Sequence, residues 1–149
     1  MHSGEDIVEY VSAWVGGQLF GLPIARVQDV FIPERLTRVP LAGPEVAGLL
    51  NLRGRIVTAI DLRRRLCLHG AEPLQMAVGV EFEGESYGLL IERIGEVLKL
   101  PSSEIEANPV NLDPVLASVS AGIYRLDGEL LVVFDVERLL AIAHSAEAA

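Results

Sequence analysis

Reactive and metal-binding side chains are scarce in this sequence of 149 residues. Cys67 is the only cysteine, which excludes an internal disulfide and leaves a thiolate metal site without ligands, so we interpret it as a small core residue. The three histidines, His2, His69 and His144, fall in the chain ends and in a turn-rich linker, where no ordered general base is expected. We therefore expect no enzyme, no cofactor and no metal site.

Basic residues and long hydrophobic runs are also few. Lys and Arg number 12 against 21 Asp and Glu, which gives a formal net charge of −9. Such a surface repels phosphate backbones and anionic lipid, so nucleic acid and membrane surfaces are not expected as partners. No stretch approaches the roughly 18 apolar residues of a membrane-spanning helix, and the opening MHSGEDIVEY lacks the pattern of a signal peptide. We expect a cytoplasmic protein without direct membrane insertion.

The sequence does contain a repeat, because its second half follows the plan of its first. Residues 17–31 (GQLFGLPIARVQDVF) resemble residues 84–98 (GESYGLLIERIGEVL), and residues 48–66 resemble residues 122–140. In both pairs the glycines, the apolar positions and several charges stay in register. The short, turn-rich linker 67–75 joins the halves. Half of all residues are apolar, so a sizeable core is available.

Each half has the pattern of β-strands. Each opens with two short apolar runs around a glycine-containing turn, which indicates a hairpin. Each closes with two apolar runs around a turn at Gly54 or Gly128, where glycine permits positive φ. Asp61 and Asp135 follow the last runs, where each carboxylate can cap a short helix. The fold predicted from these patterns is all-β, with two barrels of about five strands packed through a shared apolar seam and a few short helices.

Two segments have less regular patterns. ARVQDVF, residues 25–31, fits either a helix or a strand. SSEIEANPVNLDPVLA, residues 102–117, is polar and interrupted by prolines, which predicts a surface loop with one turn of helix.

Differences between matched positions of the repeat are candidates for function, because the fold alone does not require them. Arg53 matches Asp127, and an arginine beside Gly54 would extend a cationic side chain from a rigid turn; a merely solvated turn residue is the alternative. The arginines at 63–65 lack the glycines of a phosphate site and the aromatic neighbours of a nucleic-acid site. We interpret them as a solvated helix face.

The first half also contains a strip in which apolar and polar side chains are mixed. Val27 and Val30 lie there among Arg26, Gln28 and Asp29. Such a mixture suits a protein interface, whereas ordinary core is the alternative for the two valines.

With these residues in view, four segments in the same order resemble the CheW family of chemotaxis coupling proteins. They are GGQLFGLPIARVQDV, VAGLLNLRGRIVTAIDLRRRL, GLLIERIGEVLKLP and GIYRLDGELLVVFDVERLL. The resemblance covers nearly the whole chain and implies two intertwined, five-stranded SH3-like barrels. The implied boundaries are one domain at 8–142, with barrels at about 10–66 and 77–140 whose strands could be exchanged, and tails at 1–7 and 143–149.

The resemblance also implies a function and its site. Family members are non-enzymatic adaptors that couple methyl-accepting chemoreceptors, through their cytoplasmic helical tips, to the histidine kinase CheA, whose regulatory domain shares the fold. A cytoplasmic protein recruited to receptor arrays at the inner membrane is therefore expected. Matched residue by residue, the partner-binding positions are Val27, Asp29, Val30, Gly48 and Arg53. In the same motif Gly54 would hold the turn that aims the arginine.

Two alternatives remain open at this stage. The same module could serve a non-flagellar chemosensory system, such as surface motility or second-messenger control. A small β-barrel enzyme or ligand carrier would instead require a pocket with converging polar groups.

Overall fold

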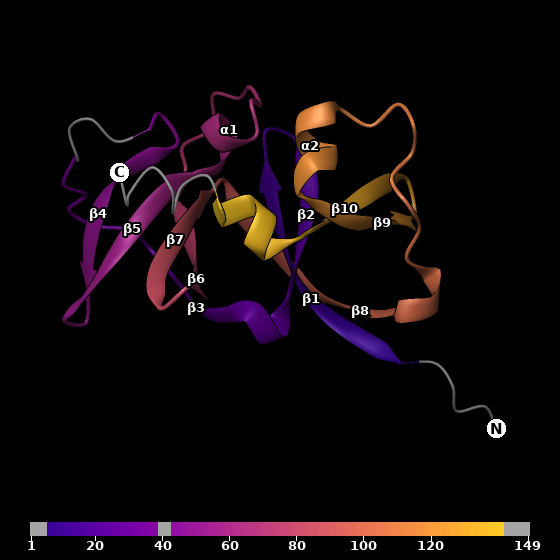
Figure 1. Ribbon diagram of the computed structural model, residues 1–149, viewed down its shortest axis with the longest axis horizontal. Helices are drawn as coiled ribbons and strands as arrows, with labels where there is room; N and C mark the ends of the chain where they lie inside the picture. The colour runs from indigo at the N-terminus through magenta and orange to yellow at the C-terminus, as the bar shows by residue number, and fades with distance from the viewer. Residues whose placement is uncertain (1–5, 39–42, 142–149) are drawn as a thin grey trace.

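The computed structural model describes residues 6–38 and 43–141, which form two five-stranded β-sheets (Figure 1). In chain order the strands are β1 (Ile7–Val15), β2 (Gln18–Pro23), β3 (Val27–Phe31), β4 (Val46–Leu52), β5 (Arg55–Asp61), β6 (Met76–Phe82), β7 (Glu85–Ile91), β8 (Arg93–Pro101), β9 (Ser120–Leu126) and β10 (Glu129–Phe134). The helical segments are short: η1 (Ile24–Arg26), α1 (Leu62–Arg65), η2 (Ser102–Glu104), α2 (Pro114–Val119) and residues 136–141. The all-β prediction of two five-stranded units is confirmed.

Each sheet takes strands from both halves of the sequence. The β1 sheet has the order β8-β1-β2-β10-β9, and the β3 sheet has the order β3-β6-β7-β5-β4. The first hairpin of each half therefore lies among strands of the other half, as Figure 1 shows at right and left. Parallel pairing of β2 with β10 and of β7 with β5 joins the exchanged hairpins to their sheets.

The exchange takes place at two short crossovers. Only η1 lies between β2 and β3, and only Glu92 lies between β7 and β8. Neither link forms a hairpin turn, and each carries the chain forward into the other sheet. The boundaries near 66 and 77 consequently do not separate the sheets. β1 already begins at Ile7, and most of both expected tails lies outside the described residues.

Three apolar clusters among the described residues make up the core. The largest lies between the two sheets, where the rings of Phe20 and Phe134 stack with centroids 4.6 Å apart. A second cluster fills the β1 barrel around Tyr10 and Tyr124, whose hydroxyl oxygens lie 3.2 Å apart; burial raises the pKa of Tyr10. A third, aliphatic cluster around Leu50 fills the β3 barrel. The shared apolar seam expected from the sequence is the first of these clusters.

Three expectations of local structure need refinement or correction. Residues 25–31 are the end of η1 followed by strand β3. The insert at 102–117 contains η2 and the start of α2, which is more than the one turn of helix expected. Asp113 caps α2 by accepting a hydrogen bond from the Val115 amide at 2.8 Å. Cys67 is exposed, so the core assignment is wrong. It has φ of 56° just past α1, and its amide donates to the Arg64 carbonyl at 3.2 Å in a helix-terminating turn.

Matched backbone bridges close the two barrels. The chain beyond β3 pairs with β4 at Thr37 and Leu49, and the chain beyond η2 pairs with β9 at Glu106 and Ile123. The four bonds of these bridges measure 2.7 to 2.9 Å.

Glycines with positive φ make room for these bridges. Gly48 has φ of 155°, and a Cβ there would collide with the carbonyl oxygen of Thr37. Gly122 has φ of 145°, and a Cβ there would come within 3.0 Å of the carbonyl oxygen of Glu106. Gly48, assigned to partner binding by resemblance, thus has a backbone role that its repeat counterpart shares.

Substituting these glycines should open the barrels. Gly48→Ala and Gly122→Ala should each lower the free energy of unfolding by about 2 kcal/mol, because strain and collision add. Gly128→Ala is the matched control, since φ there is 85° but nothing lies within 4 Å of an added Cβ. It should cost only about 1 kcal/mol. Urea denaturation measures all three, and a Gly48→Ala cost no larger than that of Gly128→Ala would contradict this role.

Candidate functional site

The edge strand β3 carries three of the five expected partner-binding residues. β3 is the outermost strand of its sheet and pairs with β6 alone among the described strands. Its side chains alternate, so that Val27, Asp29 and Phe31 are half-buried while Gln28 and Val30 are exposed. Val30 retains 40% of its surface. The strand thus presents both an apolar side chain and an open backbone edge.

Asp29 has an unusual environment within this strand. Its Oδ1 atom is buried and has no hydrogen-bond partner among the described residues. It lies over Gly79 of β6, where a Cβ would collide with it. Gly79 therefore makes room for the carboxylate. A buried acceptor without a donor costs free energy.

Arg53 lies at the tip of the β4–β5 hairpin. It has φ of 53° and Gly54 has φ of 84°, the geometry of a two-residue turn that follows the twist of the strands. The Gly54 amide donates to Oδ1 of Asn51 at 3.0 Å, which fixes the turn. Arg53 is exposed. At the matched turn of the β1 sheet only Gly128 has positive φ, whereas Asp127 does not. The strained arginine is thus particular to this turn.

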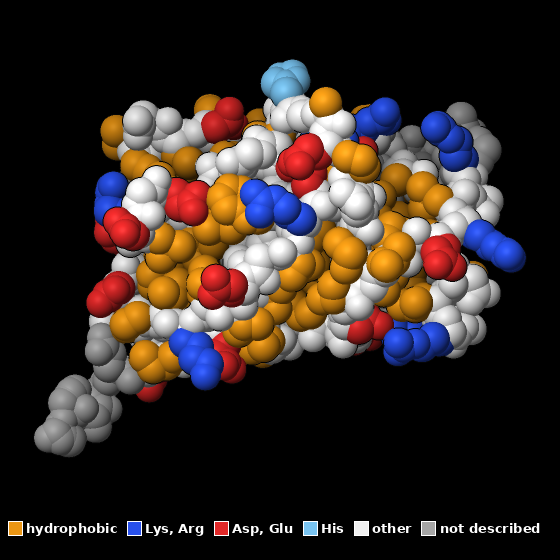
Figure 2. All heavy atoms as spheres, turned by 180° about the vertical axis from the view of Figure 1, so that it is seen from behind, with side chains coloured by type: hydrophobic (Ala, Val, Ile, Leu, Met, Phe, Trp, Pro, Cys, Tyr) orange, Lys and Arg blue, Asp and Glu red, His pale blue; other side chains and the backbone are white. Residues whose placement is uncertain are grey.

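A hollow between β3 and β4 links these two regions. A pit of about 80 Å³ lies between Phe31 and Leu52, and it shares Glu34, Leu50 and Asn51 with a wider hollow of about 510 Å³. We call this pair the β3–β4 hollow. Figure 2 shows hydrophobic side chains gathered in a broad band across one face of the molecule.

Isoleucines around the β3–β4 hollow are unusually exposed. Ile32 follows β3 with 66% of its surface exposed, and Ile56 of β5 retains 61%. Sequence reasoning missed both residues. The signal for Ile56 was available, because it stands two residues after the turn glycine, where its strand has not yet entered the core.

The arginines of α1 are less solvated than expected. Nη1 of Arg63 lies 3.0 Å from Oε2 of the buried Glu92. Arg65 donates from Nε and Nη2 to the carbonyl oxygens of Leu139 and Arg138, at 3.0 and 3.1 Å. Burial lowers the pKa of Arg65. Only Arg64 is largely exposed, so the solvated-face interpretation is wrong for the other two.

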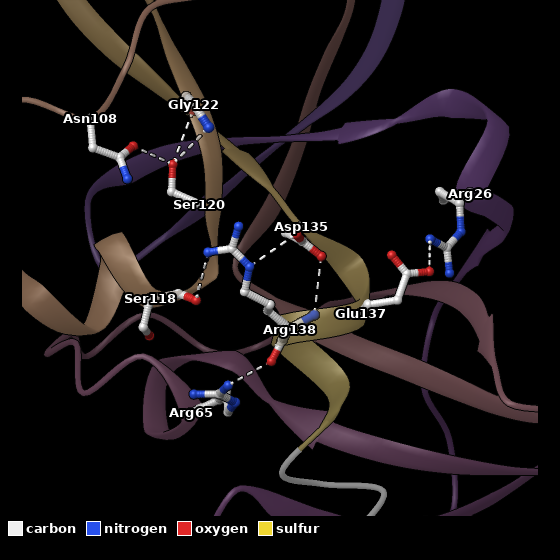
Figure 3. A network of polar contacts seen from close by, with 9 residues as sticks. All are labelled: Arg26, Arg65, Asn108, Ser118, Ser120, Gly122, Asp135, Glu137 and Arg138. Carbon is white, nitrogen blue, oxygen red and sulfur yellow. Dashed lines mark hydrogen bonds and ion pairs between the residues drawn. The ribbon is translucent and has the colours of Figure 1, made fainter.

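Asp61 and Asp135 occupy equivalent helix starts. Asp61 accepts from the Arg64 amide at 3.1 Å, and Asp135 accepts from the Arg138 amide at 3.1 Å. Figure 3 shows the second of these caps within a network in which Arg138 also approaches the Ser118 carbonyl of α2. These aspartates organise the frame and do not line the β3–β4 hollow.

The described residues contain no group of three or more His, Cys, Asp or Glu side chains placed to hold a metal ion. None of the helices within residues 6–38 and 43–141 is long and apolar enough to cross a membrane. What the site offers is an apolar hollow, an open strand edge and one projecting cation. Such a combination can bind a protein surface.

Comparison with known proteins agrees with this geometry. The family model described as "CheW-like domain" matches residues 9–144. The chemotaxis protein CheW of Treponema pallidum is 25% identical over 147 residues, which cover 95% of this chain and 86% of that protein. The chemotaxis protein CheW of Bacillus subtilis is 25% identical over 140 residues, covering 93% and 88%.

Two further matches widen the comparison. The chemotaxis protein CheA of Salmonella typhimurium is 26% identical over 136 residues, which cover 89% of this chain but 19% of CheA. The crystal structure of the scaffolding protein TtCheW from Thermoanaerobacter tengcongensis superposes with a TM-score of 0.83 at 24% identity, covering 94% of this chain and 92% of that one. That likeness establishes the fold. Because the family model spans nearly the whole chain, this protein belongs to the CheW-like domain family.

Proposed function

We propose that this protein is a non-enzymatic adaptor that couples chemoreceptors to the histidine kinase CheA. The observation that carries the proposal is the match of nearly the whole chain to CheW proteins and of the same residues to one segment of CheA. An adaptor and a kinase segment of one fold can meet through related surfaces. The protein would work in the cytoplasm and be recruited to receptor arrays at the inner membrane.

The β3–β4 hollow and the edge of β3 supply the contact surface of this proposal. An apolar side chain of CheA or of a receptor helix can enter the hollow beside Ile32 and Ile56. Arg53, outside the hollow at the hairpin tip, can pair with an acidic side chain. The exposed side chain of Val30 on β3 would be covered by the partner.

A charge at Val30 tests the assigned face. Val30→Asp should weaken binding of the CheA regulatory domain at least tenfold, because a carboxylate would be buried in an apolar contact. Val97→Asp is the matched control: Val97 is the repeat counterpart in β8 and is 49% exposed. Val97→Asp should change the affinity by no more than about twofold, because an exposed substitution outside the contact has little effect. Titration calorimetry with both variants decides, and unchanged binding by Val30→Asp would show that the face is wrong.

Arg53 offers a test in which stability and coupling move in opposite directions. Asparagine tolerates positive φ better than arginine, so Arg53→Asn should raise the free energy of unfolding by about 0.5 kcal/mol. The same variant should reduce receptor-dependent activation of CheA, because the projecting cation is gone. Asp127→Asn at the matched turn should leave activation unchanged. Full activation by Arg53→Asn in a reconstituted receptor and kinase assay would remove Arg53 from the contact.

A further inference from the structure

Both crossovers between the sheets are held by an ion pair from the helix that closes a half. Arg63 and Glu137 each stand two residues after a capping aspartate, at matched positions of the repeat. Arg63 pairs with Glu92 at the β7–β8 crossover, with Nη1 and Oε2 3.0 Å apart. Glu137 pairs with Arg26 at the β2–β3 crossover, with Oε2 and Nη1 2.7 Å apart. The helix supplies the cation, Arg63, in the first pair and the anion, Glu137, in the second.

The two pairs differ in their exposure to solvent. The side chains of Glu92 and Arg63 are 3% and 18% exposed, and Glu92 also accepts the Gly16 amide at 2.9 Å. The side chains of Arg26 and Glu137 are 31% and 63% exposed. A buried pair is held tightly, because either charge alone would remain uncompensated, whereas a partly exposed pair is weak and screened by salt. The β2–β3 crossover is therefore the adjustable one.

Arg26 connects this crossover to β3 and its neighbour. It is the residue directly before β3, and its Nη2 donates to the carbonyl oxygen of Glu81 on β6 at 3.2 Å. Gln28 of β3 reaches the same residue, with Nε2 donating to Oε1 of Glu81 at 3.4 Å. Figure 3 shows the Arg26 and Glu137 side chains extending toward each other from the crossover and from residues 136–141. A hollow of about 530 Å³ lies between these elements.

From this arrangement we infer that Arg26 and Glu137 are positioning residues for the edge strand β3. Their ion pair ties the start of β3 to residues 136–141, more than 100 positions further along the chain. The helix at 136–141 thereby sets where Val27, Asp29 and Val30 lie for a partner. The inference rests on the proposed function only where it concerns binding, since the position of β3 is a property of the free protein. The partner surface thus depends on salt through a pair that does not touch the partner.

Charge inversion separates positioning from direct contact. The variants are Arg26→Glu, Glu137→Arg and the double variant that carries both. Each single change should weaken binding of the CheA regulatory domain about fivefold at low salt. Each should also speed amide hydrogen exchange of residues 28–31 in the free protein. The double variant should restore both quantities in part, because it re-forms the ion pair while a glutamate at position 26 cannot donate to the Glu81 carbonyl. The losses should shrink at high salt.

A second exposed ion pair provides the matched control. Arg125 and Glu106 lie 2.9 Å apart in the β1 sheet region, with side chains 61% and 45% exposed. Inverting this pair, singly or doubly, should leave the exchange of β3 and the affinity unchanged. An equal effect on β3 would mean that any loss of a surface charge acts this way, and the inference would fall.

The remaining outcomes separate this inference from the proposed function. Loss of affinity in Arg26→Glu without faster exchange of residues 28–31 means that Arg26 touches the partner, which overturns positioning. Single variants with unchanged exchange and affinity also overturn it, while loss of binding in Val30→Asp keeps the proposed function. Faster β3 exchange that the double variant reverses, together with unchanged binding by Val30→Asp, supports positioning of β3 and rejects the assigned binding face.

Discussion

The short crossovers between the two sheets are the constraint on which the rest of the structure depends. Glu92 alone links β7 to β8, and η1 alone links β2 to β3, and at both places the hairpin continues into the opposite sheet. Every sheet is then completed by strands from the other half, and the largest apolar cluster lies between the sheets. The buried pair of Glu92 and Arg63 fixes one crossover in place. Neither half of the chain can therefore bury its hydrophobic residues without the other half.

On that frame, the matched positions of the repeat maintain the fold and the unmatched ones are free to serve binding. Gly48 and Gly122 do the same work, because each lets a neighbouring segment close its barrel. Arg53 and Asp127 occupy equivalent turns yet differ in charge and in backbone conformation. Asp29 has a buried carboxylate oxygen without a hydrogen-bond partner among the described residues. The binding proposals therefore concentrate on the β3 sheet.

Sequence reasoning predicted features that depend on neighbouring residues. The repeat gave two five-stranded units, and glycine turns and aspartate caps follow from local backbone needs that the structure shows at Gly54 and Asp61. The resemblance supplied the family, which the comparisons confirm. Contacts between distant residues were out of reach. Arg65 reaches carbonyl groups more than 70 positions away, and nothing near it in the sequence indicates them. Cys67 is exposed at the turn that ends α1, whereas its apolar side chain alone suggested a core position.

The most direct test of the exchanged frame is to divide the chain in the linker between its halves. Residues 1–72 and 73–149 can be produced as separate polypeptides, alone and together. If each sheet needs strands from both halves, either piece alone gives the circular dichroism spectrum of an unfolded chain. The two pieces together form a one-to-one complex with the β-sheet spectrum of the intact protein. A piece that folds alone into a stable β-sheet domain would contradict the account.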